Sequence, residues 1–400
     1  MRPEGNAEPT SDQSLIALRR DLHSYPELRF EEVRTAQRIA AEIAPYVDSM
    51  VQGVGGTGIL ARVDGLEPGK TVLIRCDIDA YPVADAKAVD YRSRNPGVSH
   101  ACGHDVHTAI GIGVLRYFAR NRPARGSVAV IFQPAAEIPF GGDSGAATVL
   151  ASEALRDVQP IAVLGLHCWP QLVSGEIGVE RRIAMAAKDA FEITVSGLSV
   201  HAATPASGRD AILAASSLVA ALHAGVGRRR DPHEQVAFNI GTIRGGTAQS
   251  SLASEVTLTG TLRTHEEEVR GRLRSVIAAA VEGTSLQFDV ATKLRWANEM
   301  NAVVNDSTLV ALARTSLSEL ATVVDLDPGP MTTDDFALYS VLAPTLYLKL
   351  GVAAPGHAPS PPLHSGAFDV DERCLDMGVA AMARLCLDIL SGSAGGSECI

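Results

Sequence analysis

Residues Ser99-His100-Ala101-Cys102-Gly103-His104-Asp105-Val106-His107-Thr108 place a thiol, three imidazoles and a carboxylate at the expected start of a helix. Cys102 and His104 stand two residues apart on a turn that contains Gly103, so both side chains can converge on one ion. A thiolate with an imidazole suits Zn²⁺ or a similar transition ion better than Mg²⁺ or Ca²⁺. The alternative is a polar loop that caps a helix, which is the commoner setting for any single histidine. Because five ionisable groups lie beside one glycine turn, we interpret the stretch as a metal site.

Around this stretch, three successive apolar runs predict strands, and each is followed by a polar side chain that could bind a metal. In chain order, the runs and the groups that follow them are 71–76 with Asp77 and Asp79, 127–132 with Glu137, and 161–166 with His167. The first run is apolar throughout, as strands buried on both faces of a parallel sheet are. Open α/β sheets build their sites at the carboxyl ends of such strands. The alternation of strand and helix patterns therefore predicts an α/β domain with its site at one sheet edge.

The pattern changes after about residue 182 and predicts a second, inserted domain. Its expected elements are, in order, a strand at 190–196, a helix at 209–224, strands at 236–243 and 255–262, a helix at 266–281 and a strand at 285–294. The order βαββαβ is that of a ferredoxin-like sandwich. The predicted division is a disordered N-terminus (1–11), a discontinuous catalytic domain (12–182 and 295–390), the inserted domain (183–294) and a flexible tail (391–400).

Composition limits the classes of function. The net charge of −11 argues against nucleic acid or an anionic membrane as a partner. We find no run of roughly 18 apolar residues that could span a bilayer. The six cysteines in 400 residues have no regular spacing, so we expect no disulfide framework. With a polar N-terminus that lacks an apolar export segment, a reducing cytoplasm is the expected location.

Several further motifs complete a recognisable set. They are residues 22–31, Arg75-Cys76-Asp77-Ile78-Asp79-Ala80, Cys102-Gly103-His104-Asp105, residues 165–167, Ser196-Gly197 with His201-Ala202-Ala203, residues 241–248, and Leu363-His364-Ser365 with Phe368-Asp369. In this order they resemble the M20 metallopeptidase family, amidohydrolase branch, over nearly the whole chain. That branch contains aminoacylases, hippurate hydrolases and hydrolases of auxin–amino acid conjugates.

The resemblance implies a two-domain fold in which a catalytic α/β domain holds two divalent metal ions. The matching ligand positions are Cys102, His104, Glu137, His167 and His364, with Cys102 contacting both ions. Zn²⁺ or Mn²⁺ is expected, and Co²⁺ and Ni²⁺ stay open because selectivity depends on availability as well as affinity. Without the resemblance, a histidine on a surface loop is an equally good interpretation of His364. Asp79 is read as a residue that orients a ligand imidazole.

The inserted domain is implied to act as a lid and as the surface of a homodimer. By resemblance, His201 would stabilise the developing oxyanion, acting within its own chain or across the dimer. Arg263 resembles the residue that grips the substrate carboxylate with two hydrogen bonds. The competing interpretation of His201 is a loop histidine beside a turn proline. For Arg263 it is an arginine on a surface strand.

One departure from the family pattern concerns catalysis. The family loop reads Gln-Pro-Ala-Glu-Glu, in which the first glutamate is the general base and the second is a metal ligand. Here the loop reads Gln133-Pro134-Ala135-Ala136-Glu137, so an alanine stands at the position of the base. Losing a positioned base typically costs about 10²–10⁴ in rate. We favour an engineered substrate-trapping change over natural divergence, because every other ligand position is intact.

Two further departures concern the substrate. Ser250 stands where the family has an asparagine that helps to hold the substrate, and Asp334 stands where a glutamate is usual. Both changes shorten the side chain while keeping a polar group, so we expect a reshaped pocket. The predicted function is metal-dependent hydrolysis of the amide of an N-acyl amino acid, with little turnover by this chain. The alternatives are a non-catalytic binder of acylated ligands and a dipeptidase of the same fold.

Overall fold

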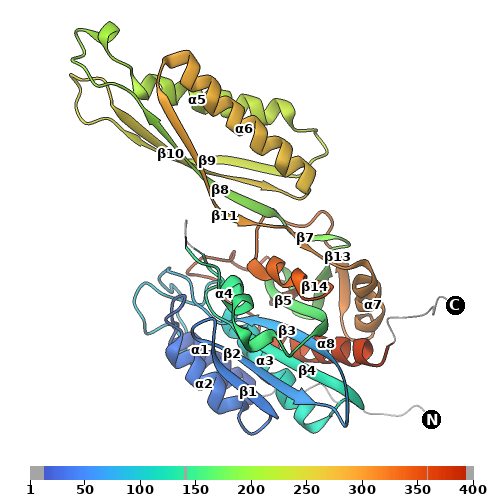
Figure 1. Cartoon of the computed structure of the whole chain (residues 1–400). Helices are drawn as coiled ribbons and strands as arrows, with labels where there is room; N and C mark the ends of the chain where they lie inside the picture. Colours follow the sequence, from blue (N-terminus) through green and yellow to red (C-terminus); the bar gives the residue numbers. More distant parts are fainter. Residues whose placement is uncertain (1–12, 139–141, 358, 393–400) are drawn as a thin grey trace, which may run out of the picture.

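The buried apolar runs become the central strands of an eight-stranded mixed sheet (Figure 1). The computed structural model describes residues 13–138, 142–357 and 359–392. In chain order the strands are β1 (Ser49–Val54), β2 (Gly58–Asp64), β3 (Glu67–Asp77), β4 (Arg125–Gln133), β5 (Pro160–Val173), β6 (Glu176–Val179), β13 (Thr322–Asp325) and β14 (Thr345–Ala353). Their spatial order is β1-β2-β4-β3-β5-β14-β6-β13, and β3 pairs in parallel with both neighbours.

Successive residues of the central strands face opposite sides of this sheet and pack in different cores. On β3, Val72 and Ile74 lie in one core and Leu73 lies in the other, which is the two-residue period of a strand. The first core contains α1 (Gln13–Ser24), α2 (Val33–Ile43), α3 (His104–Arg120), α7 (Ser307–Leu317) and α8 (Cys374–Leu390). The second contains α4 (Gly145–Ala151) and the 3₁₀ helices η1 (Glu153–Leu155) and η3 (Asp335–Val341). Coverage of both faces confirms the predicted α/β class.

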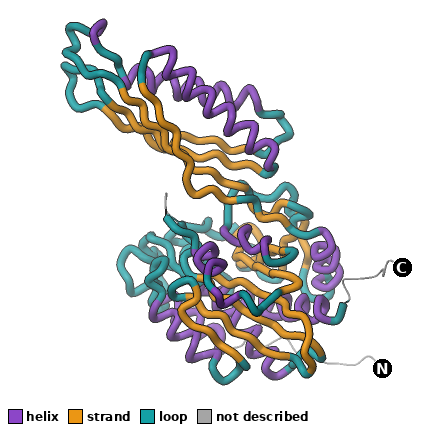
Figure 2. The backbone as a smooth tube through the Cα atoms, in the orientation of Figure 1, coloured by secondary structure: helices purple, strands orange, loops and turns teal. Residues whose placement is uncertain are grey.

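The second domain is a four-stranded antiparallel sheet with its helices on one face (Figure 2). Its elements are β8 (Ala187–Ser196), α5 (Ala211–Arg229), β9 (Val236–Gly245), β10 (Glu255–Thr264), α6 (Glu267–Phe288) and β11 (Ala291–Met300). The sheet order is β11-β8-β10-β9. This confirms the predicted ferredoxin-like βαββαβ arrangement. We call this domain the lid.

The limits of the lid differ by a few residues from the predicted 183–294. Strand β7 (Ile183–Met185) pairs with β12 (Val303–Val304) outside the lid sheet, and β11 continues to Met300. The lid sheet therefore begins at Ala187 and ends at Met300. The segment predicted to be disordered (1–11) lies outside the described residues, as does all but Ser391 and Gly392 of the predicted tail.

Two boundaries of predicted strands are wrong, one at the end of a strand and one at the start. The strand expected at 161–166 continues to Val173, because its parallel pairing with β14 runs on beyond His167. His167 consequently lies inside a strand instead of following it. Residues 285–288, expected to begin a strand, belong to α6, which stops at Asp289 in the left-handed conformation (φ 51°). The final lid strand then begins at Ala291.

The prediction that no stretch is long and apolar enough to span a bilayer is corrected by α5. This 19-residue helix passes that test by length and composition. Its inward residues, among them Ala214, Leu218 and Leu222, pack in the lid core against the sheet. A core helix of a folded domain passes the same test, so one such helix is weak evidence for a membrane span.

Candidate metal centre

The predicted ligand stretch lies where α3 begins, beside the carboxyl ends of β3 and β4. His104 is the first residue of α3, and Gly103 before it adopts the left-handed conformation (φ 85°). A Cβ on Gly103 would lie 2.6 Å from the Cys168 sulfur, so glycine is required there both by conformation and by space. The tight turn allows Cys102 and His104 to face the same side of the sheet edge.

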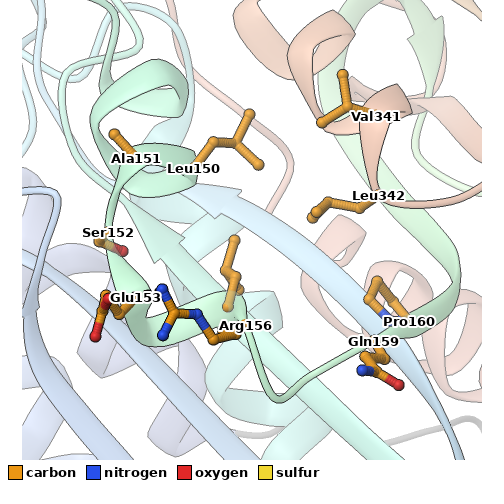
Figure 3. A pocket seen from close by; sticks show the side chains of 10 residues that line it. Leu150, Ala151, Ser152, Glu153, Arg156, Gln159, Pro160, Val341 and Leu342 are labelled. Carbon is orange, nitrogen blue, oxygen red and sulfur yellow. Dashed lines mark hydrogen bonds and ion pairs between the residues drawn. The ribbon is translucent and has the colours of Figure 1, made fainter.

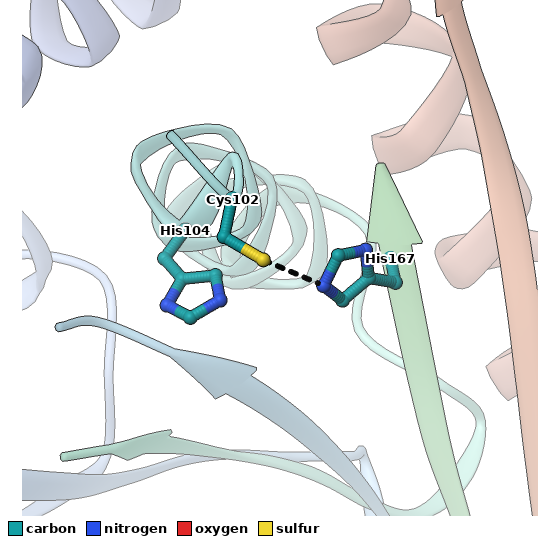
Figure 4. Close-up of side chains that lie close together, drawn as sticks. All are labelled: Cys102, His104 and His167. Carbon is teal, nitrogen blue, oxygen red and sulfur yellow. Dashed lines mark hydrogen bonds between the residues drawn. The ribbon is translucent and has the colours of Figure 1, made fainter. Parts of the chain in front are cut away.

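The side chains of Cys102, His104 and His167 converge, with one potential ligand atom of each within 4.8 Å of the others (Figure 4). The Cys102 sulfur lies 3.4 Å from Nε2 of His167. Nδ1 of His167 donates to the Cys168 carbonyl (2.9 Å), and Nδ1 of His104 donates to the Asp79 carbonyl (2.8 Å). Both imidazoles are thus oriented through Nδ1, which directs the Nε2 lone pairs to a common ion.

A second group of donors shares the same thiol. Cys102, Glu137 and His364 also lie within 4.8 Å of one another, and Nε2 of His364 donates to Oε1 of Glu137 at 2.9 Å. The His364 ring stacks on Tyr81, with ring centroids 4.0 Å apart. His364 has a positive φ of 64°, which turns the C-terminal loop toward the cluster. The distant histidine and the strand-end glutamate therefore meet at Cys102.

The cluster has the chemistry of a site for soft or borderline ions. Burial raises the pKa of the Cys102 thiol and lowers the pKa of His167 to about 3. Burial also acts to lower the pKa of His104, but Asp77, Cys102 and Asp79 together outweigh it, and the net pKa is well above the usual value. A buried thiol with a raised pKa becomes a thiolate readily only when a cation compensates its charge. The donor set fits a transition-metal ion.

His107 belongs to one further potential donor group, with Asp77 and His104, but both of its ring nitrogens already have hydrogen-bond partners. Its Nδ1 lies 2.5 Å from Asp77, and its Nε2 accepts a hydrogen bond from the Cys168 backbone at 2.9 Å. With both ring nitrogens engaged, His107 is a structural residue next to the cluster.

Asp79 contacts one residue of each of the two donor groups that share Cys102. Its Oδ1 lies 3.1 Å from Nδ1 of His104, and its Oδ2 accepts a hydrogen bond from the backbone N–H of Glu137 at 2.9 Å. This buried carboxylate therefore contacts the imidazole of His104 and the backbone of Glu137, and its role in orienting a metal ligand stays a prediction.

We expect Asp79→Ala to weaken the affinity for Zn²⁺ by about 10–100-fold, the usual cost of removing a partner that orients a metal ligand. The measurement is a competition titration against a chromophoric chelator at fixed pH. Asp157→Ala, which changes an exposed aspartate on a loop, is the control and should leave the affinity unchanged. Equal affinities for the two variants would contradict the orienting role of Asp79.

The loop around position 136 is held from both sides. The Ala135 N–H donates to Oε1 of Glu32 at 2.9 Å, and the Glu137 N–H donates to Asp79. Glu32 is fully buried, and its other oxygen accepts from the Thr57 hydroxyl. Burial raises the pKa of Glu32, and these hydrogen bonds oppose the shift. Sequence reasoning missed Glu32, although it directly follows the family-like motif at 22–31.

A buried ion cluster beneath the site was also missed. The Arg75 guanidinium contacts Asp77 at 2.5 Å, Asp335 at 2.6 Å and Asp334 at 3.2 Å. The Asp77 carboxylate in turn bonds His107 and lies 3.4 Å from Nε2 of His104. Arg75 appears in the family-like motif at the end of β3, but its partner Asp335 is 260 residues away and leaves no local signal.

Asp334, predicted to contact substrate, lies against this cluster. One carboxylate oxygen of Asp334 lies within 4.8 Å of donor atoms of Asp77 and His167, and the Tyr347 hydroxyl donates to it. Burial acts to raise the pKa of Asp334, but Arg75 lowers it. The side chain is therefore an ionised neighbour of the His167 side of the cluster.

The three lid residues predicted to act in catalysis or substrate binding lie at opposite ends of the lid. Arg263 lies near the end of β10 that faces the catalytic domain and donates to the Met331 carbonyl at 2.9 Å. His201 and Ser250 lie in the two loops that meet at the other end of the lid (Figure 1), where the Ala202 N–H donates to the Ser250 carbonyl at 2.8 Å. Nδ1 of the exposed His201 accepts from the Ala203 N–H. The chain does not bring His201 or Ser250 to its own metal cluster.

A pocket of about 500 Å³ lies elsewhere, between the end of α4 and the end of η3 (Figure 3). Leu150, Arg156 and Leu342 are among its lining residues. None of the described residues that line it belongs to the metal cluster, so it is separate from the candidate centre.

Comparison with known proteins gives consistent matches. Residues 73–388 match Peptidase family M20/M25/M40. The chain is 32% identical to the N-acetyl-L-cysteine deacetylase of Bacillus subtilis (strain 168) over 368 residues, which is 92% of this chain and 86% of that protein. It is 32% identical to the N-acetyldiaminopimelate deacetylase of the same organism over 373 residues, 92% of this chain and 97% of that protein. The solved structure of the Bacillus subtilis YXEP protein, described as a dinuclear metal binding peptidase, superposes with a TM-score of 0.81 at 29% identity, covering 95% of this chain and 98% of that one.

Proposed function

Because this chain belongs to peptidase family M20/M25/M40, we propose that it is a metal-dependent amidohydrolase that acts on N-acyl amino acids. The observation that carries the proposal is the convergence of Cys102, Glu137 and His364 with His104 and His167 at one sheet edge. The relatives named as deacetylases of N-acetyl amino acids support the substrate class.

We assign two divalent ions to the site, one for each donor group that shares Cys102. Zn²⁺ and Mn²⁺ are the first candidates, with Co²⁺ and Ni²⁺ as alternatives, since thiolate, imidazole and carboxylate donors suit all four. When bound, the ions supply Lewis-acid activation of water and of the scissile carbonyl. Asp79 orients His104 and the Glu137 loop, and Arg75 acts against burial to lower the pKa of Asp77.

Substrate contacts come from the lid. Arg263 is half-buried at the end of β10 near the catalytic domain, and a guanidinium there suits the α-carboxylate of an N-acyl amino acid. His201 and Ser250 lie at the outer end of the lid, so we propose that they serve the site of a partner subunit in a homodimer. An imidazole donor would then stabilise the oxyanion that develops on the carbonyl. The cytoplasmic location stays a prediction.

We further propose that hydrolysis by this chain is slow, because Ala136 supplies no general base. The rival interpretation is a non-catalytic protein that uses the same site to hold acylated ligands. A dipeptidase would differ only in the group accepted on the acyl side.

The test is amine release from a panel of N-acetyl amino acids and dipeptides by concentrated, Zn²⁺- or Mn²⁺-loaded protein. We expect slow release that a chelator abolishes and that added metal restores, with N-acetyl amino acids preferred over dipeptides. Ion content per chain, measured by elemental analysis, serves as the control for loading. If two ions bind but neither this chain nor Ala136→Glu releases amine from any compound, the binding-protein interpretation replaces the hydrolase.

A further inference from the structure

Two cationic side chains oppose each other on the helix-free face of the lid. Lys188 on β8 is the direct cross-strand partner of Arg263 on β10, and both are half-buried. Like charges directly opposite on neighbouring strands destabilise a sheet. Partial burial adds to the cost because it removes water from both charges. This cationic pair therefore needs a compensating group.

In the described part of the chain, neither side chain forms an ion pair with a carboxylate. Arg263 makes its one hydrogen bond there to a neutral carbonyl, and Lys188 makes neither a hydrogen bond nor an ion pair with any described residue. Burial, with Arg263 beside it, lowers the pKa of Lys188.

Three other arginines of the lid pair with carboxylates. On the opposite face, the neighbouring Asp189 pairs with Arg270 at 2.8 Å and with Arg274 at 3.0 Å. On the same face as Lys188, Arg295 pairs with Glu192 at 3.2 Å. Lys188 and Arg263 thus differ from these three arginines, because neither has an ion-pair partner among the described residues.

A pocket of about 350 Å³ opens beside the pair on the same face of the sheet. Its lining residues are Lys188, Ala190, Asn239, Gly241, Thr242, Arg244, Thr259, Gly260, Thr261 and Asn298. None of these described residues is acidic, and Arg244 adds another positive charge. Amide and hydroxyl side chains supply further hydrogen-bond donors, so the lining suits an anion.

Two lining residues connect this pocket to Glu137 and the loop that follows it. Lys188 is close enough to Glu137 for the carboxylate to raise its pKa, in opposition to burial. Nδ2 of Asn298 donates to the carbonyl of Gly142, five residues after Glu137 in the same loop. A ligand whose amide lies at the metal cluster can therefore extend toward Lys188.

We propose that Lys188 and the pocket beside it form a subsite for a second anionic group, so that the preferred ligands are N-acyl derivatives of amino acids with an acidic side chain. Arg263 takes the α-carboxylate and Lys188 takes the carboxylate of the side chain, one cation for each anion. The inference rests on the proposed function, because it assumes that the acylated amino acid binds at this cluster.

The experiment compares N-acetyl-L-glutamate with N-acetyl-L-glutamine, two ligands of equal size that differ by one charge. Their dissociation constants are measured by calorimetry with the Zn²⁺-loaded chain, and the slow turnover that we propose for it would permit binding measurements. A charge-assisted hydrogen bond contributes enough for a preference of about 10-fold or more for the glutamate derivative. Lys188→Met, which keeps the length of the side chain without its charge, is expected to remove this preference.

Lys293→Met is the matched control, since Lys293 is an exposed lysine on the same sheet, outside the pocket lining. It should retain the preference. Equal affinities of the unchanged chain for both ligands would overturn the subsite and leave the proposed function standing. An equal loss of affinity for both ligands in Lys188→Met would also overturn it, because Lys188 would then hold the α-carboxylate. Failure of both ligands to bind the metal-loaded chain would count against the proposed function itself.

Discussion

Replacing Ala136 with glutamate is expected to raise kcat for the hydrolysis of N-acyl amino acids by about 10²–10⁴-fold, the usual contribution of a positioned general base. The loop is already built for such a residue. The Ala135 N–H is held by Glu32, and the Glu137 N–H is held by Asp79, so the backbone on each side of position 136 is fixed. A carboxylate introduced there would stand on a backbone that is already held in place.

The measurement is the steady-state rate of amine release with equal metal loading of both proteins. Ala136→Gln is the control, because it has the size of glutamate and cannot take a proton; we expect it to stay within a few-fold of the unchanged chain. The rate of Ala136→Glu should fall as its carboxylate is protonated at low pH. An equal gain in the glutamine variant would mean that size, and not basicity, was missing.

Replacing Arg75 with methionine is expected to lower the free energy of unfolding by about 3–5 kcal/mol, the typical cost of removing one partner from a buried ion pair. The Arg75 side chain is 1% exposed and contacts three buried carboxylates, on Asp77, Asp334 and Asp335. Even with Arg75 present, burial raises the pKa of Asp335 to about 6. Without the guanidinium, these carboxylates must stay charged without compensation or take up protons, and either outcome costs free energy.

Urea unfolding in the presence of a chelator measures this effect apart from any change in metal binding. Arg156→Met is the matched control, because Arg156 pairs with Glu153 at the surface, where both side chains are more than two-thirds exposed. Surface pairs of this kind contribute about 0–1 kcal/mol. If the two variants lose similar stability, the buried cluster does not depend on Arg75.

Local patterns in the sequence predicted the elements of this protein well. The apolar run at 71–76 became the core of β3, because a strand buried on both faces of a sheet leaves an unbroken apolar signature. The βαββαβ order of the lid was readable from the change of period after residue 182. The ends of elements were predicted less accurately. β5 continues beyond His167 because β14 pairs with it. Pairing with a strand almost 200 residues away leaves no signal in the local sequence.

The sequence by itself determined the fold class, the inserted lid and the kinds of donor atom available for a metal. These follow from residue type, period and short-range spacing, which are properties of neighbouring residues. Only the tertiary structure decided that Glu32 and Asp79 hold the loop at position 136, and that Lys188 opposes Arg263. It also separated His201 from the metal cluster of its own chain. Each of these facts depends on strand register and on packing between segments far apart in the chain, and the free energy of such contacts is set by the whole fold.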